Sequence, residues 1–592
     1  MTDQEAPVFR KLEILKEMDE EAISTLYSEG TVLKLRAGDI LFNQGSESDA
    51  LYILITGRLV ALGDDPQTGE SHAYGFIQPG EFVGEMGLIS NKARSLTILA
   101  QLDATLFQLN RSKFYELMDQ HPQVLTPILM SVIDRLQGTL SGSRGGTQPQ
   151  STMLVAANGS VRMDRLAAQM NSTLRNHGVK YILLSEDDMY EKCGVKSDWS
   201  DVLPWLNQIE KEYDVAIYIC ADYGSVWMRH CLQYAERVVI VGSGETGAEY
   251  DSRLTELFDH SEHEHFVKEL VLLYENPSPN SHSVSEWIKR YKYFRHHHVV
   301  IDDGQSTERM CRFLTGTAKA LVLAGGGTRG WVHIGAMRAF SEVGLEFDLV
   351  GGTSAGSAAA ALYATGAEYD YISQTMDSLM RASLEVVKLR HYTLPIVSIS
   401  DASVNTMLLQ RVFGETSIEQ LARQFYCVSC DISRNREIVH DRGLLWQAVR
   451  ASCSVPGLAP PVVIEGDMHI DGGIINNMPV DIARKKLAGV GTVVAVDLSA
   501  TQESDTRYYF PPKLSLGDLL AHKLKLRNRK YQFSNLGTIL MGTIMASSER
   551  RMAENRQLAD ILIRPELHGY GMLDDARDEL MQLGYRAAVE AL

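Results

Sequence analysis

The sequence has 592 residues, a net charge of −18, 45% hydrophobic residues and 22% charged residues. A chain of this length exceeds what one hydrophobic core supports, so several domains are expected. Its acidic balance argues against a broad nucleic-acid surface, which needs clustered Lys and Arg. The N-terminus lacks the basic-then-apolar order of a signal peptide, and no apolar run approaches the ~20 residues of a membrane span. We therefore expect a cytoplasmic protein that reaches membranes only peripherally, at their inner face.

The N-terminal part of the chain alternates short β-branched runs with glycine turns, for example at 31–35, 50–55 and 95–99. Strands this short, separated by turn residues, predict a small β-barrel or jelly roll. A stretch with apolar residues at helical spacing follows the last run. We assign the barrel and its helices to residues 8–138 and interpret the Gly- and Ser-rich residues 139–151 as a flexible linker.

From about residue 152 the pattern changes to continuous apolar strands separated by helical stretches. The expected strands are 152–156, 181–184, 215–219, 237–241 and 269–273. This alternation predicts a parallel sheet covered by helices on both faces, as in a Rossmann-like domain. We assign that domain to residues 152–300, a second α/β domain to 318–500 and a mainly helical extension to 501–592.

A glycine turn and a nearby arginine in the barrel have the composition of a cyclic nucleotide site. Exposed amides in the turn, the Glu85 carboxylate and the Arg94 guanidinium suit a cyclic phosphodiester on a ribose. The region resembles the cyclic nucleotide-binding domain, and the resemblance assigns Gly84 and Glu85 to the ribose and Arg94 and Ser95 to the phosphate. The same barrel also occurs as a docking module without nucleotide. The alternative is therefore a structural turn in which Arg94 pairs a local carboxylate.

Two loops with the pattern GxGxxG follow predicted strands, at 242–247 and 325–330. A lone match is weak evidence for a phosphate site, and acidic residues follow the first loop, so we interpret it as a plain turn. About twenty residues after the second loop comes Gly352-Thr353-Ser354-Ala355-Gly356, between a strand and an Ala-rich helix. That context is typical of a nucleophile elbow, in which Gly352 and Gly356 permit the tight turn that presents Ser354.

The loop at 325–330 complements such a serine. Its backbone N–H groups suit the oxyanion that forms when the serine attacks an ester carbonyl, and Arg329 adds a positive charge beside it. The residues that we assign to an oxyanion hole are Gly325, Gly326, Gly327, Arg329 and Gly330. The alternative is a dinucleotide-dependent enzyme that uses the same loop for its cofactor.

The base that activates Ser354 is harder to find. His440 and His469 are the nearby downstream histidines. Asp471 is a stronger candidate, because it ends a predicted strand before two glycines that let another backbone come close. A carboxylate is a weak base towards a hydroxyl, but it serves when it is desolvated and within hydrogen-bond reach.

Blocks at 325–330, 352–356 and 471–473, in this order, resemble the patatin-like phospholipase family over about residues 318–485. The resemblance implies a catalytic dyad of Ser354 and Asp471 with no histidine. It makes His333, which follows the glycine loop, a packed helix residue rather than a base.

The whole order of domains resembles the neuropathy target esterase group, which acts as phospholipases and lysophospholipases. The expected fold class is multidomain α/β, with an N-terminal β jelly-roll barrel with helices, a middle Rossmann-like parallel α/β domain and a C-terminal patatin-like α/β hydrolase domain. The sequence departs from the animal members of the group in lacking an N-terminal membrane span and in carrying one recognisable barrel.

These features predict a serine esterase that hydrolyses acyl esters of phospholipids or lysophospholipids through an acyl-enzyme, without a metal or organic cofactor. The expected partners are this lipid substrate, a peripheral membrane surface and a cyclic nucleotide or protein at the barrel, but no nucleic acid. The alternative function is a nucleotide-responsive signalling scaffold with a silent hydrolase domain.

A basic run at 522–531 precedes an apolar stretch at 536–545. Basic residues beside an apolar helix are suited to bind anionic headgroups. The alternative interpretation is a core helix with a solvated basic face.

Overall fold

The computed structural model describes residues 29–592 except 37, 65–70, 78–79, 101–103, 126–127, 130–131, 133–150, 176, 195–198, 223, 260–266, 277–280, 291–292, 386–392, 394–395, 500–512, 514, 516, 518–535 and 573. The chain packs as two compact units, one up to Gly316 and one from Thr317 onward, apart from exchanges at 279–285 and 488–490. The basic run at 522–531 and all but the last residue of the expected linker lie outside the described residues.

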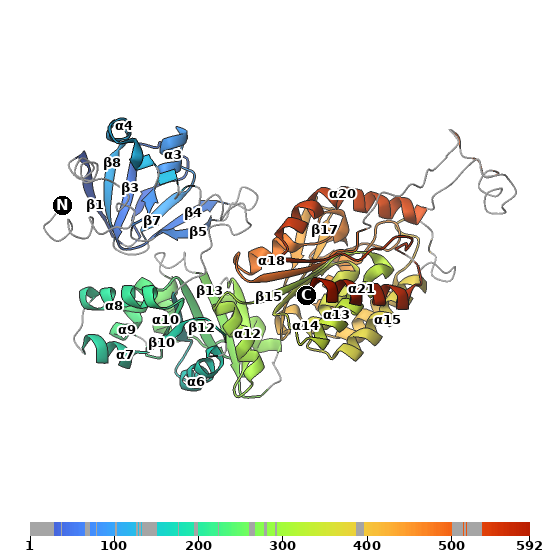
Figure 1. Cartoon of the computed structure of the whole chain (residues 1–592). Coiled ribbons are helices and arrows are strands. Elements are labelled where there is room, and N and C mark those ends of the chain that lie inside the picture. Colours follow the sequence, from blue (N-terminus) through green and yellow to red (C-terminus); the bar gives the residue numbers. More distant parts are fainter. Residues whose placement is uncertain are drawn as a thin grey trace. The chain divides into compact units, whose positions relative to one another are not determined.

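In the first unit, two antiparallel four-stranded sheets form a barrel, with strand orders β1-β8-β3-β6 and β2-β7-β4-β5 (blue in Figure 1). The bounds are β1 (Thr31–Leu35), β2 (Ile40–Phe42), β3 (Ala50–Thr56), β4 (Leu59–Asp64), β5 (Ser71–Ile77), β6 (Phe82–Val83), β7 (Thr97–Ala100) and β8 (Ala104–Asn110), with helices α3 (Glu85–Ser90) and α4 (Arg111–Gln120).

Successive side chains of β3 point to opposite faces of its sheet. Leu51 and Ile53 pack in one apolar cluster with Phe114 of α4, whereas Tyr52 and Leu54 pack in a second cluster with residues of the other sheet. The alternation explains why a strand of this length is buried on both faces. The predicted jelly-roll-like barrel is confirmed.

The same unit contains a six-stranded sheet in the order β10-β11-β9-β12-β13-β14, with every neighbouring pair parallel. The strands are β9 (Ser151–Ala156), β10 (Tyr181–Leu184), β11 (Val215–Cys220), β12 (Arg237–Ser243), β13 (Val267–Tyr274) and β14 (Arg295–Val300). The helices between and after them are α6 (Met163–Leu174), α7 (Glu186–Cys193), α8 (Trp199–Glu212), α9 (Val226–Tyr234), α10 (Ser252–Asp259), α11 (Ser281–Arg290) and α12 (Gly304–Leu314). The prediction of a parallel sheet from continuous apolar strands is confirmed.

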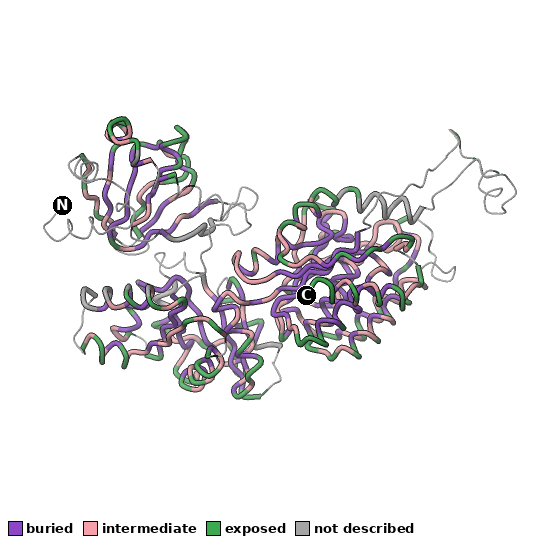
Figure 2. The backbone as a smooth tube through the Cα atoms, viewed as in Figure 1, coloured by how far each residue is buried: buried purple, intermediate pink, exposed green. Residues whose placement is uncertain are grey.

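The second unit is built on a larger sheet, in the order β19-β20-β17-β16-β15-β21-β22, with β18 paired to β17. Its strands are β15 (Lys319–Leu323), β16 (Leu349–Thr353), β17 (Gln424–Asp431), β18 (Arg436–His440), β19 (Val462–Ile464), β20 (Asp467–Asp471), β21 (Thr492–Val496) and β22 (Ile561–Ile563). Strands β17, β16, β15, β21 and β22 run parallel, and β18, β19 and β20 pair antiparallel. Strands β15, β16, β17 and β21 are almost entirely buried (purple in Figure 2), as is typical of parallel strands that helices cover.

The helices of this unit are α13 (Trp331–Glu342), α14 (Ala355–Ala364), α15 (Tyr369–Glu385), α16 (Ser403–Phe413), α17 (Leu445–Ser452), α18 (Val480–Lys486), α20 (Leu536–Leu558) and α21 (Arg577–Ala591). The expected C-terminal extension therefore contributes β22 to the sheet and α21 to its cover. Helix α21 packs on α13 with backbones in close approach, because a Cβ on Gly335 would lie 1.9 Å from Met581 O and one on Gly584 would lie 2.1 Å from Val332 O.

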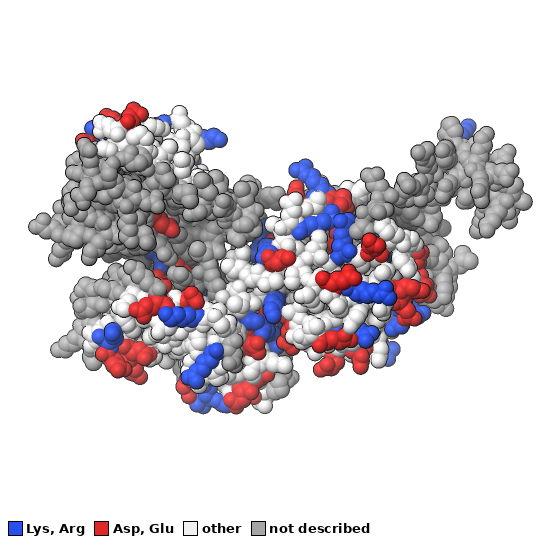
Figure 3. All heavy atoms as spheres, in the orientation of Figure 1, with Lys and Arg blue, Asp and Glu red and all other residues white. Residues whose placement is uncertain are grey.

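On the face drawn in Figure 3, Lys and Arg side chains of the described residues are interspersed with Asp and Glu. No broad basic area is visible on the described part of that face, which agrees with the net charge of −18. Within the described ranges, no helix is both long enough and apolar enough to span a bilayer.

Candidate active site

Ser354 lies at the turn between strand β16 and helix α14. Its backbone has φ 53° and ψ −125°, a conformation that strains a residue with a side chain. Its amide donates a hydrogen bond of 2.9 Å to Ser452 Oγ, so helix α17 holds the turn from the other side. The predicted strand–turn–helix geometry of a nucleophile elbow is therefore present.

Neither glycine of the elbow has a positive φ, so backbone conformation does not require glycine at these positions. Glycine is required because the neighbouring backbone comes too close for a side chain. A Cβ on Gly356 would lie 2.1 Å from Leu323 O, and one on Gly352 would lie 2.7 Å from the same oxygen. Both contacts are shorter than real Cβ atoms tolerate. The GxSxG spacing therefore lets helix α14 sit directly against the end of strand β15, which leads into the glycine loop.

Asp471 meets Ser354 from strand β20. Ser354 Oγ donates to Asp471 Oδ2 at 2.7 Å, and Asp471 Oδ1 accepts the amide of Gly473 at 2.8 Å. The Asp471 amide in turn donates to Ser454 O at 2.9 Å. The carboxylate is 3% exposed and has no cation partner among the described ion pairs. Burial raises its pKa to about 6, although the hydrogen bonds from Ser354 and Gly473 act in the opposite direction.

This pKa predicts the pH dependence of any reaction that uses Asp471 as a base. Only the ionised carboxylate accepts a proton, so kcat/KM should rise with pH to a plateau, with an acid limb centred near pH 6 and a roughly tenfold fall per pH unit below it. Hydrolysis of an uncharged short-chain ester between about pH 4 and pH 9 measures this limb. A limb near the ordinary aspartate value of 3.8 would show that the carboxylate is not desolvated.

The two downstream histidines lie in a separate cluster. Ser429 Oγ lies 2.6 Å from His440 Nε2 and 2.9 Å from His469 Nδ1. Burial lowers the pKa of His440 to about 4 and also lowers that of His469. His333 is buried in α13 with Nε2 donating to Ala324 O at 2.8 Å, and burial lowers its pKa to about 4. In the described structure, the acceptor for Ser354 Oγ is Asp471 rather than any of these histidines.

The glycine loop packs against the nucleophile. A Cβ on Gly325 would lie 3.1 Å from Ser354 Cβ and 2.4 Å from Asn477 Oδ1. The Gly325 amide donates to Asn477 O, and Asn477 Nδ2 donates back to Gly325 O, both at 3.0 Å. Among the described hydrogen bonds, the amides of Gly326 and Gly327 have no protein acceptor. The loop is thus held by Gly325 and leaves two N–H groups available.

Arg329 braces this loop through backbone carbonyls. Its Nε and Nη2 donate to Tyr570 O at 3.0 and 2.6 Å, and its Nη1 donates to Leu498 O at 3.2 Å. The guanidinium is therefore engaged with the segments after β21 and β22. Gly330 lies below the elbow, where a Cβ would be 3.1 Å from Ala355 Cβ.

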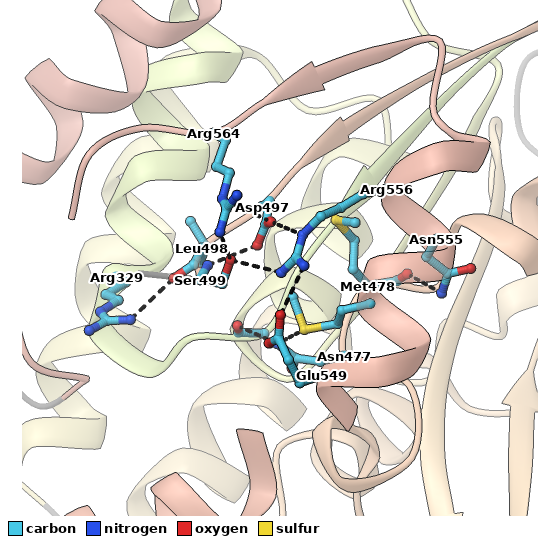
Figure 4. A network of polar contacts seen from close by, with 12 residues as sticks. Arg329, Asn477, Met478, Asp497, Leu498, Ser499, Glu549, Asn555, Arg556 and Arg564 are labelled. Atoms are coloured by element: carbon cyan, nitrogen blue, oxygen red, sulfur yellow. Dashed lines mark hydrogen bonds and ion pairs between the residues drawn. The ribbon is translucent and has the colours of Figure 1, made fainter. Parts of the chain in front are cut away.

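A polar network continues from that brace into helix α20 (Figure 4). Asp497 is fully buried and pairs with Arg556 at 2.8 Å and with Arg564 at 3.5 Å. Ser499 donates its amide to Asp497 and accepts a bond from Arg556 Nη2 at 3.1 Å. The chain between them carries Leu498, whose carbonyl holds Arg329. Helix α20 and strand β22 therefore stabilise the oxyanion-loop side of the site.

A pocket opens beside the nucleophile. Ser354, Ala355 and Gly327 are among its lining residues. Most other lining side chains are apolar, among them Leu379, Met380, Leu409, Val455, Leu458 and Met572. An apolar wall beside a nucleophile and free amides suits the acyl chain of an ester substrate.

The residues expected to bind a cyclic nucleotide are engaged within the barrel. Arg94 is 3% exposed, donates to Gly84 O and Ala50 O at 2.9 and 2.8 Å, and pairs with Asp49 at 3.1 Å. Its guanidinium stacks 4.1 Å from the centroid of the Phe42 ring. Glu85 is buried and Ser95 is exposed. A phosphate at Arg94 has to displace these contacts, so the docking-module alternative agrees with this geometry, and nucleotide binding stays a prediction.

The first glycine loop, at the end of β12, is filled by protein groups. A Cβ on Gly244 would lie 2.1 Å from the Tyr274 ring, and Glu245 Oε1 accepts the amides of Glu275 and Asn276 at 3.0 Å. These contacts agree with the interpretation of a structural turn.

Sequence reasoning missed several residues that support the site. Ser452 binds the nucleophile amide, Asn477 holds Gly325, and Asp497 with Arg556 anchors the far side of the loop. Asn477 lies six residues after Asp471 in the sequence. This proximity could have indicated that Asn477 lies near the site. The contribution of Arg556 had no local signal, because its partner lies 59 residues away.

Comparison with known proteins agrees with this geometry. Residues 321–484, which contain the elbow, the glycine loop and Asp471, match the patatin-like phospholipase family. This segment is similar to a patatin domain. Residues 32–121 match the cyclic nucleotide-binding domain, and residues 151–322 match the neuropathy target esterase family P-loop like domain. The resemblance to the neuropathy target esterase group is confirmed.

Two curated relatives align with nearly the whole chain. The chain is 27% identical to patatin-like phospholipase domain-containing protein 7 of Rattus norvegicus, over 94% of this chain and 45% of the relative. It is 26% identical to lysophospholipase nte1 of Neosartorya fischeri, over 93% of this chain and 41% of the relative. The chain thus spans less than half the length of these relatives. A solved cyclic nucleotide-binding-like protein from Brucella abortus aligns with 20% of this chain and 99% of that chain, at 24% identity and a TM-score of 0.18.

Proposed function

We propose that this chain is a serine esterase that hydrolyses acyl esters of glycerophospholipids, with lysophospholipids as the preferred class. The observation that carries the proposal is the hydrogen bond of 2.7 Å from Ser354 Oγ, which lines a mainly apolar pocket, to the buried Asp471 carboxylate. The patatin domain and the relative named lysophospholipase support the choice of substrate class.

In the proposed reaction, Asp471 accepts the Ser354 proton while Ser354 Oγ attacks the acyl carbonyl carbon. The amides of Gly326, Gly327 and Ala355 hold the resulting oxyanion, since Ala355 follows the nucleophile at the start of α14. The intermediate collapses, and the glycerol oxygen leaves with the proton held by Asp471. Water then attacks the acyl-enzyme, gives a proton to Asp471 and releases the fatty acid, and the proton returns to Ser354.

A fluorophosphonate probe tests the nucleophile directly, because it phosphonylates an activated serine. The wild-type chain is expected to label stoichiometrically, and Ser354→Ala is expected to lose labelling completely. Ser357→Ala is a matched control, because Ser357 Oγ lies one helical turn away and donates to Ser354 O. Labelling that persists in Ser354→Ala, or a wild type that never labels, would contradict the proposal.

We also propose that the protein is cytoplasmic and meets its lipid substrate peripherally at a membrane surface, because long-chain lipid esters lie at interfaces. The barrel is then a regulatory module for a cyclic nucleotide or a partner protein. The hydrogen-bonded Ser354 and Asp471 support this esterase over a signalling scaffold with a silent hydrolase domain. Calorimetry with cyclic AMP, cyclic GMP and cyclic di-GMP distinguishes regulation by a nucleotide from regulation by a partner protein. If none of the three releases or absorbs heat on mixing, the nucleotide hypothesis is rejected.

A further inference from the structure

The pocket beside Ser354 contains one charged side chain in an otherwise uncharged lining. That residue is Arg450, from helix α17, and it is 5% exposed. Most of the lining is apolar, so the guanidinium is not explained by contact with the acyl chain. A buried cation in an apolar wall is costly unless an anion or several hydrogen bonds compensate it.

The partners of Arg450 are all neutral. Its Nε donates to Thr406 Oγ1 at 3.0 Å, its Nη1 to Ser454 Oγ at 2.5 Å and its Nη2 to Pro460 O at 3.3 Å. A guanidinium has five N–H groups, so one remains on each terminal nitrogen. Among the described ion pairs none involves Arg450, and burial lowers its pKa from the usual value without removing its charge. The Arg450 guanidinium therefore keeps a positive charge at the pocket without an anionic partner among the described residues.

A second lining residue, Asn405 of helix α16, presents an acceptor without a donor. Ser383 Oγ donates its proton to Leu379 O at 3.0 Å and therefore accepts a bond of 3.3 Å from Asn405 Nδ2. This assignment directs Asn405 Oδ1 away from Ser383, and Oδ1 is buried without a hydrogen-bond partner in the described structure. Buried polar atoms of this kind are uncommon and point to a missing ligand group or water.

The two groups belong to the same wall of the pocket. Thr406, which binds Arg450 Nε, is the residue after Asn405 in α16. The wall thus offers one cation with two free donors and one free acceptor. A phosphodiester next to a free hydroxyl is the complementary pair of ligand groups.

We propose that Arg450 and Asn405 form a polar subsite for the glycerophosphate end of the substrate, with the phosphate at Arg450 and a free glycerol hydroxyl at Asn405 Oδ1. The inference rests on the proposed esterase function and names its substrate as a monoacyl glycerophosphodiester. A diacyl phospholipid has no hydroxyl for Asn405, and a monoacylglycerol has no phosphate for Arg450.

Three substrates with the same acyl chain test the subsite in the full chain: palmitoyl lysophosphatidylcholine, monopalmitoylglycerol and a deoxy lysophosphatidylcholine without the free hydroxyl. Arg450→Gln should lower the ratio of kcat/KM for the lysophospholipid over the monoacylglycerol by at least about 30-fold, because a buried charge-assisted bond is lost. Arg450→Lys should lower this ratio less, since lysine keeps the positive charge but lacks the paired N–H donors of the guanidinium. Asn405→Leu should lower the ratio for the lysophospholipid over its deoxy analogue by about 5-fold to 10-fold.

Gln447→Ala is the matched control, because Gln447 lies on the same helix α17 but outside the pocket lining, and its side chain donates to Val463 O. Its substrate ratios should stay within about twofold of the wild type. Fluorophosphonate labelling reports whether each variant keeps a folded site around Ser354. If Arg450→Gln does not label, the substrate ratios of Asn405→Leu and Arg450→Lys test the subsite instead.

Equal losses on all three substrates in Arg450→Gln, or a ratio change in Gln447→Ala as large as that in Arg450→Gln, would overturn the subsite and make Arg450 a structural residue. Unchanged ratios in labelled variants would overturn it too. A wild type that hydrolyses none of the three esters would instead refute the proposed function, so the two failures are distinguishable.

Discussion

Replacing Asp471 by asparagine is expected to lower kcat/KM for ester hydrolysis by about 10⁴-fold while making the folded protein more stable. The loss of activity follows because asparagine has almost the same shape but cannot take the proton from Ser354 Oγ, which now donates to Asp471 Oδ2 at 2.7 Å. The Gly473 amide can still donate to the remaining carbonyl oxygen, so the turn after β20 should survive.

The gain in stability follows from the raised pKa of Asp471. The folded protein binds this proton more tightly than the unfolded chain, whose aspartate has a pKa near 3.8, against about 6 when folded. Ionisation therefore costs stability as the pH rises from about 4 to about 6, and the full cost, about 3 kcal/mol, is present at neutral pH. Asparagine removes that cost, so the patatin domain should melt roughly 5 °C higher at pH 7.5.

Thermal unfolding of both proteins at pH 7.5 and at pH 4 measures this linkage. The stability gain of Asp471→Asn should be large at pH 7.5 and small at pH 4, where the folded carboxyl is protonated and the unfolded one is only partly ionised. A gain of the same size at both pH values would show that the charge of Asp471 is not its cause. Wild-type turnover by the variant would contradict the role of Asp471 as the base.

Gly356→Ala is expected to lower kcat/KM by at least about 100-fold and to destabilise the patatin domain by about 3 kcal/mol. The added Cβ would lie 2.1 Å from Leu323 O and 2.6 Å from Leu323 C, and both are backbone atoms that no side-chain rotation can clear. Relief requires α14 to move away from the end of β15. That movement separates Ser354, which precedes α14, from the glycine loop, which follows β15.

Gly304→Ala is the matched control, since it adds the same methyl group at the first residue of α12, where nothing lies within 4 Å of the built Cβ. Its activity and melting temperature should equal those of the wild type or rise slightly. Circular dichroism melts and hydrolysis of a short-chain ester measure both variants. Wild-type kcat/KM in Gly356→Ala would show that the contact between β15 and α14 does not set the geometry of the site.

Local patterns predicted the elements that carry the chemistry. The run Gly352–Gly356 between a strand and an Ala-rich helix predicted the elbow at Ser354, and the structure has it with φ 53°. The apolar runs predicted parallel sheets, which the strand pairings confirm. Such features are readable because they depend on neighbours a few residues apart.

The base was not readable in the same way. The residues favoured Asp471 over His440 and His469, but a dyad without a histidine followed only from the family resemblance. In the structure, Ser429 of β17 pairs in register with Asp471 of β20, and its hydroxyl lies within hydrogen-bond distance of both histidines. Antiparallel pairing of strands that lie about forty residues apart in the sequence thus decides which side chain reaches Ser354.

By itself the sequence predicted Ser354 as the nucleophile and determined its tight turn, the glycine loop and the class of each sheet, because each depends on residue type and local spacing. Only the tertiary structure decided that the C-terminal segment completes the site, through β22, the Asp497–Arg556 pair and the contact of α21 with α13. It also placed Arg450 in the acyl pocket. The physical reason is that strand order and helix docking depend on burial summed over the whole unit. In addition, a strand of three residues such as β22 is too short for its sequence pattern to predict it.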